Sequence, residues 1–184
     1  MTSPMAGGRA WFAQWEDAVV LAERFGHQLQ RRQQVFACAE SCTGGLIAAL
    51  ATSVAGSSAW FDRGLVTYSN QAKVSNLGVS PDLLAQFGAV SEPVAKAMAV
   101  GVLTQAPHVD VAVSTTGIAG PGGATPGKPV GMVCMGFAQR QAGEVTARAL
   151  THIFPGDRQH VRLATVHYVL MQAFTEFGLN DLSC

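Results

Sequence analysis

Two periods of hydrophobicity follow one another along this chain, and each predicts a kind of secondary structure. Residues 10–32 place apolar side chains at helical spacing with Glu and Arg between them, which predicts an amphipathic helix. The stretch 35–48 opens with a short apolar run that predicts a buried strand, and the LIAALA that closes it predicts a helix. A second strand is expected over residues 61–68, and a short helix over residues 71–77.

The middle of the chain carries two helix starts. Ser80-Pro81-Asp82 and Ser91-Glu92-Pro93 each place a capping serine and a proline where a helix begins, and the second helix is expected to run to Ala106. Residues 109–115 predict a buried strand. The loop after it, residues 116–131, is too rich in Gly and Pro for regular structure.

The last third of the chain predicts a β-hairpin and a helix. Residues 131–139 and 144–154 have the composition of strands, with a turn near Ala142-Gly143. The closing helix is expected from Arg158 to about Phe177. Strands that alternate with helices, followed by this hairpin, predict an α/β fold: a three-layer α/β/α domain with a mixed β-sheet.

Composition narrows the class of protein. The chain has 184 residues, which suits one domain over residues 1–184, with residues 1–8 expected to form a loose tail. Because 48% of the residues are hydrophobic and the formal net charge is zero, we expect a compact soluble domain that binds neither nucleic acid nor membranes. The N-terminus has no apolar signal segment and no apolar stretch is long enough to span a membrane, so the expected location is the cytoplasm.

The cysteines and histidines do not suggest a metal. No C-x-x-C pair occurs, and no histidine stands at zinc-ligand spacing from a cysteine. His160 and His167 lie seven residues apart on the closing helix and share a face, but no third ligand accompanies them. We therefore expect no metal and no cofactor, and we interpret both histidines as packing or surface residues.

Ser41 lies where the strand of the 35–48 stretch joins its helix. Gly44 and Gly45 permit close approach of a ligand, and the amides of Cys42, Thr43 and Gly44 are expected to be unpaired donors at the first helical turn. Such donors suit an anion or a developing oxyanion. Two alternatives remain at this point: Ser41 or Thr43 only caps the helix, or Cys42 is a thiolate nucleophile of lowered pKa.

A serine nucleophile needs a base, and Tyr68 and Lys73 flank a turn that would present both toward Ser41. A lysine at a helix N-terminus is disfavoured by the helix dipole, which favours its neutral form. The alternatives are a solvated lysine and an edge tyrosine with its hydroxyl in water. Asn70, between them, either orients Lys73 or the substrate or simply forms the turn.

Four ordered blocks resemble the CinA C-terminal domain family, the nicotinamide-nucleotide amidohydrolases. They are AESCTGG at 39–45, GSSAWFDRGLVTYSNQAKVSNLGV at 56–79, TGIAGPGG…GKPVG at 116–131 and FPGDRQHVR at 154–162. The resemblance implies hydrolysis of the carboxamide of nicotinamide mononucleotide to nicotinic acid mononucleotide and ammonia, without a metal, in pyridine nucleotide recycling. It places the nucleophile on Ser41 and its partners on Tyr68 and Lys73, and gives Cys42 no role. The chain resembles the stand-alone form of the family.

Acyl transfer to Ser41 is the mechanism we infer, and the substrate phosphate then needs a cradle of its own. The backbone amides of residues 116–123 are one candidate, and the Thr43–Gly45 turn is a second. Lys128 and Arg158 would add positive charge, unless the glycine loop is only a connection and Arg158 pairs with Asp157. The expected substrate-binding residues are Cys42, Thr43, Gly44, Gly45, Asn70, Thr116, Gly117, Gly120, Gly122, Gly123 and Arg158.

A second class of function remains open from the sequence. The chain would then be a nucleotide-binding or regulatory module that keeps the pocket without turnover. A homodimer through the apolar face of the first helix is a further hypothesis, although the same face would serve equally to pack on its own domain.

Overall fold

A five-stranded mixed sheet forms the centre of the computed structural model, which describes residues 4–179. The strand order is β2-β1-β3-β4-β5, with β1 parallel to β2 and β3, and with β3, β4 and β5 antiparallel. The strands are β1 (Phe36–Glu40), β2 (Phe61–Val66), β3 (Val111–Gly117), β4 (Met132–Gln141) and β5 (Glu144–Ile153). The predicted mixed sheet and its hairpin, with the turn at Ala142-Gly143, are confirmed.

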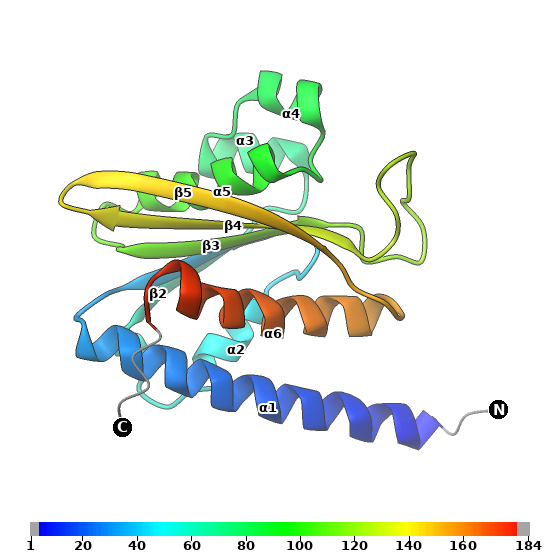
Figure 1. Ribbon diagram of the computed structural model, residues 1–184, viewed down its shortest axis with the longest axis horizontal. Coiled ribbons are helices and arrows are strands. Elements are labelled where there is room, and N and C mark those ends of the chain that lie inside the picture. The colour runs from blue at the N-terminus through cyan, green and yellow to red at the C-terminus, as the bar shows by residue number, and fades with distance from the viewer. Residues whose placement is uncertain (1–3, 180–184) are drawn as a thin grey trace.

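Helices cover both faces of the sheet (Figure 1). The helices α1 (Pro4–Arg31), α2 (Leu46–Thr52) and α6 (Arg158–Glu176) lie on one face, and α3 (Asn70–Leu77), α4 (Pro81–Phe87) and α5 (Glu92–Gln105) lie on the other. A short 3-10 helix, Ser57–Ala59, leads into β2. The three-layer α/β/α prediction is confirmed.

The two faces of the sheet bury separate apolar cores. On the α1 side, the ring of Phe25 packs edge-on against Phe36, with centroids 5.1 Å apart, and against Phe174 at 5.7 Å. On the α5 side, Met98 and Leu103 are fully buried against the sheet. Each such side chain stabilises the fold by roughly 1.5–3 kcal/mol through burial, which fixes the sheet on which the site is built.

The first helix is longer than the periodicity predicts. It begins at Pro4, so the loose tail expected for residues 1–8 is wrong for residues 4–8, and residues 1–3 lie outside the described part of the chain. The apolar face of α1 packs on its own domain, where Ala18, Phe25 and Leu29 are fully buried. No helix within residues 4–179 is long and apolar enough to cross a membrane.

The parallel strands bring three loops to one edge of the sheet. Glu40, the last residue of β1, pairs with Val66 of β2 and with Thr115 of β3. The residues that follow each strand therefore meet at the carboxyl edge, where ligands of such sheets bind. Strand β2 ends at Val66 rather than at Tyr68, because its partner β1 ends at Glu40, and the bond from the Thr67 amide to the Glu40 carbonyl at 2.8 Å is the last of the pair.

Candidate active site

Ser41 follows β1 directly and is held at the carboxyl edge of the sheet. Its amide donates to the Thr115 carbonyl at 2.9 Å, and its side chain is buried apart from a small exposed fraction of 8% for the residue. Helix α2 begins only at Leu46, after a turn in which Gly44 and Gly45 have φ of 61° and 97°. Only glycine adopts this left-handed conformation without strain, so both glycines serve the turn itself.

Lys73 is the nearest partner of Ser41. It lies in the first turn of α3, is 1% exposed, and its Nζ lies 3.1 Å from Ser41 Oγ and 2.8 Å from the Thr67 carbonyl. Burial lowers the pKa of Lys73 below its ordinary value, and the nearby Cys42 opposes this only in part. Because burial disfavours the ammonium form, Lys73 is suited to accept the proton of the Ser41 hydroxyl.

Tyr68 stands apart from this pair. Its side chain is exposed, at 60%, and its hydroxyl accepts a hydrogen bond of 3.0 Å from Nη2 of Arg158. Within the described residues the hydroxyl bonds to neither Ser41 nor Lys73; the Tyr68 carbonyl, at 3.5 Å, is what Lys73 Nζ approaches. The geometry thus brings Ser41 and Lys73 together and leaves the Tyr68 hydroxyl on the outer side of the site.

Glu40 is a functional residue that sequence reasoning missed. It is completely buried, and its carboxylate accepts the amides of Gly45 at 3.0 Å, Ile47 at 3.1 Å and Ala48 at 3.0 Å. These are first-turn donors of α2, which a helix leaves unpaired unless a side chain accepts from them. The sequence does show an acidic residue just before the turn. It does not stand out as a helix cap, because α2 begins six residues after it in the chain.

Some backbone amides of the Ser41 turn donate hydrogen bonds to oxygen atoms of the protein, and others do not. Gly44 donates to the Ser41 carbonyl at 3.1 Å and Gly45 to Glu40, so the predicted unpaired amide of Gly44 is wrong. Within residues 4–179, the amides of Cys42 and Thr43 donate to no carbonyl or side-chain oxygen, and the acceptor beside them is the weakly accepting Cys42 sulfur. These two donors therefore remain for an oxyanion next to Ser41.

The Cys42 thiol lies in the same turn and is buried. The pKa of Cys42 is raised to about 12, chiefly by burial and also by the charge of Glu40, and the amides of Cys42 and Thr43 offset this only in part. The thiol is therefore protonated at neutral pH. The alternative in which Cys42 is a low-pKa nucleophile is wrong.

Two threonines predicted to bind the substrate use their hydroxyls for hydrogen bonds within the protein. The hydroxyl oxygens of Thr43 and Thr115 lie 2.7 Å apart, and Thr116 donates to the Ala89 carbonyl at 2.8 Å. Thr43 and Thr116 are both almost completely buried. They fix the Ser41 turn and the end of β3, and neither hydroxyl is free to contact a ligand.

The alternative in which Ser41 or Thr43 only caps the helix is wrong too, because the Glu40 carboxylate accepts from the amides in the first turn of α2.

The glycine loop contacts the site residues at one point, the Gly120 carbonyl. Gly117 is the last residue of β3, where a Cβ would lie 2.7 Å from the Met132 carbonyl. The Gly120 carbonyl accepts from Nη1 of Arg158 at 2.9 Å, whereas Gly122 and Gly123 are exposed. Asn70 is exposed as well, at the start of α3, where Ser69 is the cap.

Lys128 is turned away from this point of contact. Thr125 and Lys128 pair across the tip of the glycine loop, and Lys128 Nζ donates to the Phe87 carbonyl at the end of α4. The hydrogen bond holds the tip against α4. The ammonium group of Lys128 is therefore occupied by a hydrogen bond to a neutral backbone carbonyl.

Arg158 and Arg162 both lie in the first turns of α6. The predicted alternative of an Arg158–Asp157 pair is wrong, because the Asp157 carboxylate accepts the His160 amide at 2.9 Å and caps the helix. Arg162, which sequence reasoning missed, donates from Nη2 to the Thr43 carbonyl at 2.7 Å. It thus fastens α6 to the Ser41 turn.

Comparison with models of known protein families identifies the family of this chain. The model of the CinA C-terminal domain matches residues 19–176, which include the Ser41 turn, Lys73 and the start of α6. The chain belongs to the CinA C-terminal domain family.

Relatives of two lengths share this CinA domain. The chain is 52% identical over 160 residues to a nicotinamide-nucleotide amidohydrolase PncC of Enterobacter agglomerans, covering 87% of this chain and 95% of the relative. The protein of the same name from Escherichia coli K12 is 48% identical over 160 residues, covering 87% and 94%. A CinA-like protein of Chlorobaculum tepidum is 52% identical over 146 residues, covering 79% of this chain and 34% of that protein.

Solved structures of the CinA family have the same fold. The competence/damage inducible protein CihA of Agrobacterium tumefaciens superposes with a TM-score of 0.80 and 42% identity, covering 90% of this chain and 96% of that one. The CinA superfamily protein KP700603 of Klebsiella pneumoniae gives a TM-score of 0.80 and 33% identity, covering 88% and 98%.

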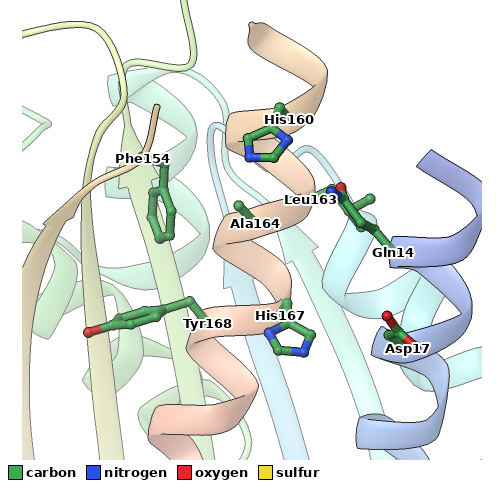
Figure 2. A pocket seen from close by; sticks show the side chains of 8 residues that line it. All are labelled: Gln14, Asp17, Phe154, His160, Leu163, Ala164, His167 and Tyr168. Atoms are coloured by element: carbon green, nitrogen blue, oxygen red, sulfur yellow. The ribbon is translucent and has the colours of Figure 1, made fainter. Parts of the chain in front are cut away.

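A cavity of about 340 Å³ lies between α1 and α6 of this CinA domain (Figure 2). The residues that line it are Gln14, Asp17, Phe154, His160, Leu163, Ala164, His167 and Tyr168. It contains none of the predicted site residues, and it confirms that His160 and His167 share a face of α6. Within the described residues, no group of three or more His, Cys, Asp or Glu is placed to hold a metal ion.

Proposed function

We propose that this chain is a nicotinamide-nucleotide amidohydrolase that converts nicotinamide mononucleotide to nicotinic acid mononucleotide and ammonia. The observation that carries the proposal is the contact of 3.1 Å between buried Lys73 Nζ and Ser41 Oγ. The names of the relatives that share 48–52% identity support the substrate.

The reaction begins with attack of Ser41 Oγ on the carboxamide carbon while the neutral amine of Lys73 takes the hydroxyl proton. The carbonyl oxygen becomes an oxyanion and accepts hydrogen bonds from the amides of Cys42 and Thr43. When the C–N bond breaks, Lys73 returns the proton to the leaving nitrogen, and ammonia departs from the acyl-enzyme. Water, deprotonated by Lys73, then attacks the ester carbon; the bond from this carbon to Ser41 Oγ breaks, and Lys73 returns the proton to Oγ as the acid is released.

Tyr68 has a different role in this proposal from the one that the resemblance implies. Its exposed ring and its bond to Arg158 support a contact with bound substrate at the rim of the site. The base is then Lys73 alone, which the short distance to Ser41 supports. Exposed Asn70, Gly122 and Gly123 are proposed to line the same rim.

The deciding experiment is ammonia release from nicotinamide mononucleotide by the wild-type chain and by Ser41→Ala, both in EDTA. We expect release by the wild type in the presence of the chelator, and a loss of at least about 10³-fold in kcat in the variant, because the nucleophile is gone. Undiminished turnover by Ser41→Ala would contradict the serine mechanism. No release by folded wild type would favour the nucleotide-binding module instead.

The homodimer and the cytoplasmic location inferred from the sequence stay predictions. Size-exclusion chromatography with light scattering would test the first. Because residues 18–29 of α1 turn their apolar face inward, a dimer through that part of the face is disfavoured.

A further inference from the structure

Two arginines lie in the first turns of α6, at the end of the helix that meets the Ser41 turn. Arg158 and Arg162 are four residues apart, which places them on the same face of the helix. Arg162 Nη2 donates to the Thr43 carbonyl at 2.7 Å, and Arg158 donates to the Gly120 carbonyl at 2.9 Å and to the Tyr68 hydroxyl at 3.0 Å. Three loops of the site are thus joined by these two side chains.

The acceptors that hold both arginines are neutral. No carboxylate oxygen of a described residue lies within 4.0 Å of either guanidinium, and the nearest acid in sequence, Asp157, is occupied with the His160 amide. Nε of Arg162 is buried and has no hydrogen-bond partner among the described residues. Positive charge without a compensating acid, beside a nucleophile, favours the binding of an anion.

The other cradle predicted for a substrate phosphate is already filled. The amides of Gly45, Ile47 and Ala48 at the start of α2 donate to the Glu40 carboxylate, and the Gly44 amide donates to the Ser41 carbonyl. A phosphate dianion placed there would meet a buried negative charge. The glycine loop offers exposed backbone, but the charge beside it is that of Arg158.

We propose that Arg158 and Arg162 form the site that binds the phosphate monoester of the substrate and selects the mononucleotide over the riboside. This inference rests on the proposed amidohydrolase function. Arginine presents its N–H donors in a planar fork that matches phosphate oxygens, so the pair supplies charge and orientation together. Bound phosphate orients the mononucleotide across the rim at Tyr68, with its carboxamide toward Ser41.

The test compares kcat/KM for nicotinamide mononucleotide and nicotinamide riboside in the wild type, Arg162→Gln and Arg158→Gln. We expect the wild type to favour the mononucleotide by at least about 100-fold, since two charge-assisted contacts are lost with the riboside. Each variant should lower the mononucleotide value roughly 10- to 100-fold, mainly through KM, and should lower the riboside value by a clearly smaller factor, since only the loss of the bonds to the site loops affects both substrates. Arg148→Gln, which removes an exposed cation of β5, is the matched control and should change neither value.

Equal values for the two substrates in the wild type, or an equal loss for both in Arg162→Gln, would overturn the phosphate site while leaving the amidohydrolase intact. Binding of the mononucleotide to the Ser41→Ala chain, measured by titration calorimetry, tests the site without turnover. Arg162→Gln added to that chain should weaken binding at least about 10-fold, and inorganic phosphate should compete only when Arg162 is present. Unchanged affinity would refute the site even if no ammonia were ever released.

Discussion

Lys73 Nζ lies 3.1 Å from Ser41 Oγ, and both residues are more than 90% buried. The lysine has no acidic partner among the described residues; its other contacts are the carbonyls of Thr67 and Tyr68. An ammonium group held only by neutral oxygens in a buried place is poorly compensated, so its proton is easily lost. This relationship is the geometric basis for proposing the serine–lysine pair as nucleophile and base.

Replacing Lys73 with methionine should abolish the chemistry without unfolding the chain. The Lys73→Met side chain fills a similar volume but has no proton acceptor, so we expect kcat to fall by at least about 10³-fold. The melting temperature should not fall, because the variant no longer buries an unpaired cation. Ammonia release and thermal unfolding measure the two effects. Turnover above a tenth of the wild-type value would refute Lys73 as the base.

The stability of the chain should depend on pH through Lys73. Because the folded-state pKa is lowered from its ordinary value of 10.5, the unfolded chain binds the proton more tightly than the folded chain does. The free energy of unfolding should therefore rise as pH rises from the lowered pKa of Lys73 toward 10.5, and should be lower by a constant amount below that window. Urea unfolding of the wild type and of Lys73→Met across this range would show the rise only in the wild type. A parallel rise in both would assign it to another group.

Glu40→Gln should weaken the fold and displace the nucleophile. The glutamine side chain has one acceptor oxygen where the carboxylate has two. Its NH₂ group would face a backbone amide that needs an acceptor, so at least one amide donor at the start of α2 is left unpaired. A loss of about 1–3 kcal/mol in the free energy of unfolding is expected for this buried group. The matched control is Glu144→Gln at the exposed end of β5, which should change stability by less than about 0.5 kcal/mol.

Activity separates the two effects of Glu40→Gln. We expect kcat to fall by a larger factor than KM rises, because the Ser41 turn moves while Arg158, held by the Gly120 carbonyl and the Tyr68 hydroxyl, keeps its place. Kinetics at a temperature where the variant is fully folded would measure this. A variant that is less stable but has wild-type kcat would limit Glu40 to folding.

The local pattern of the sequence determined the elements and their order. Hydrophobic periods of two kinds, the serine caps of α4 and the hairpin turn at Ala142-Gly143 are short-range features, and the structure places strands and helices where these predict them. The structure differs from these predictions at the ends of two elements. Strand β2 stops early since its partner β1 ends at Glu40, and α1 begins earlier than its strongest periodicity.

The candidate nucleophile and its base were also within reach of the sequence. Ser41 at a strand–helix junction and Lys73 at the start of a helix are each visible as local features, and the resemblance to the CinA family joined them. The role of Glu40 was not visible, because a carboxylate that caps a helix usually stands directly at its N-terminus, whereas here a five-residue turn intervenes.

Tertiary structure alone decided which side chains meet. Lys73 reaches Ser41 across 32 residues, Arg158 reaches Tyr68 across 90, and Arg162 reaches the Thr43 carbonyl across 119. Such contacts depend on strand order and on the rotation of α6 over the sheet, which are set by the packing of two apolar cores and not by any local pattern. The sequence therefore specified the groups available for chemistry, and the packing specified that Tyr68 contacts Arg158 while Lys73 contacts Ser41.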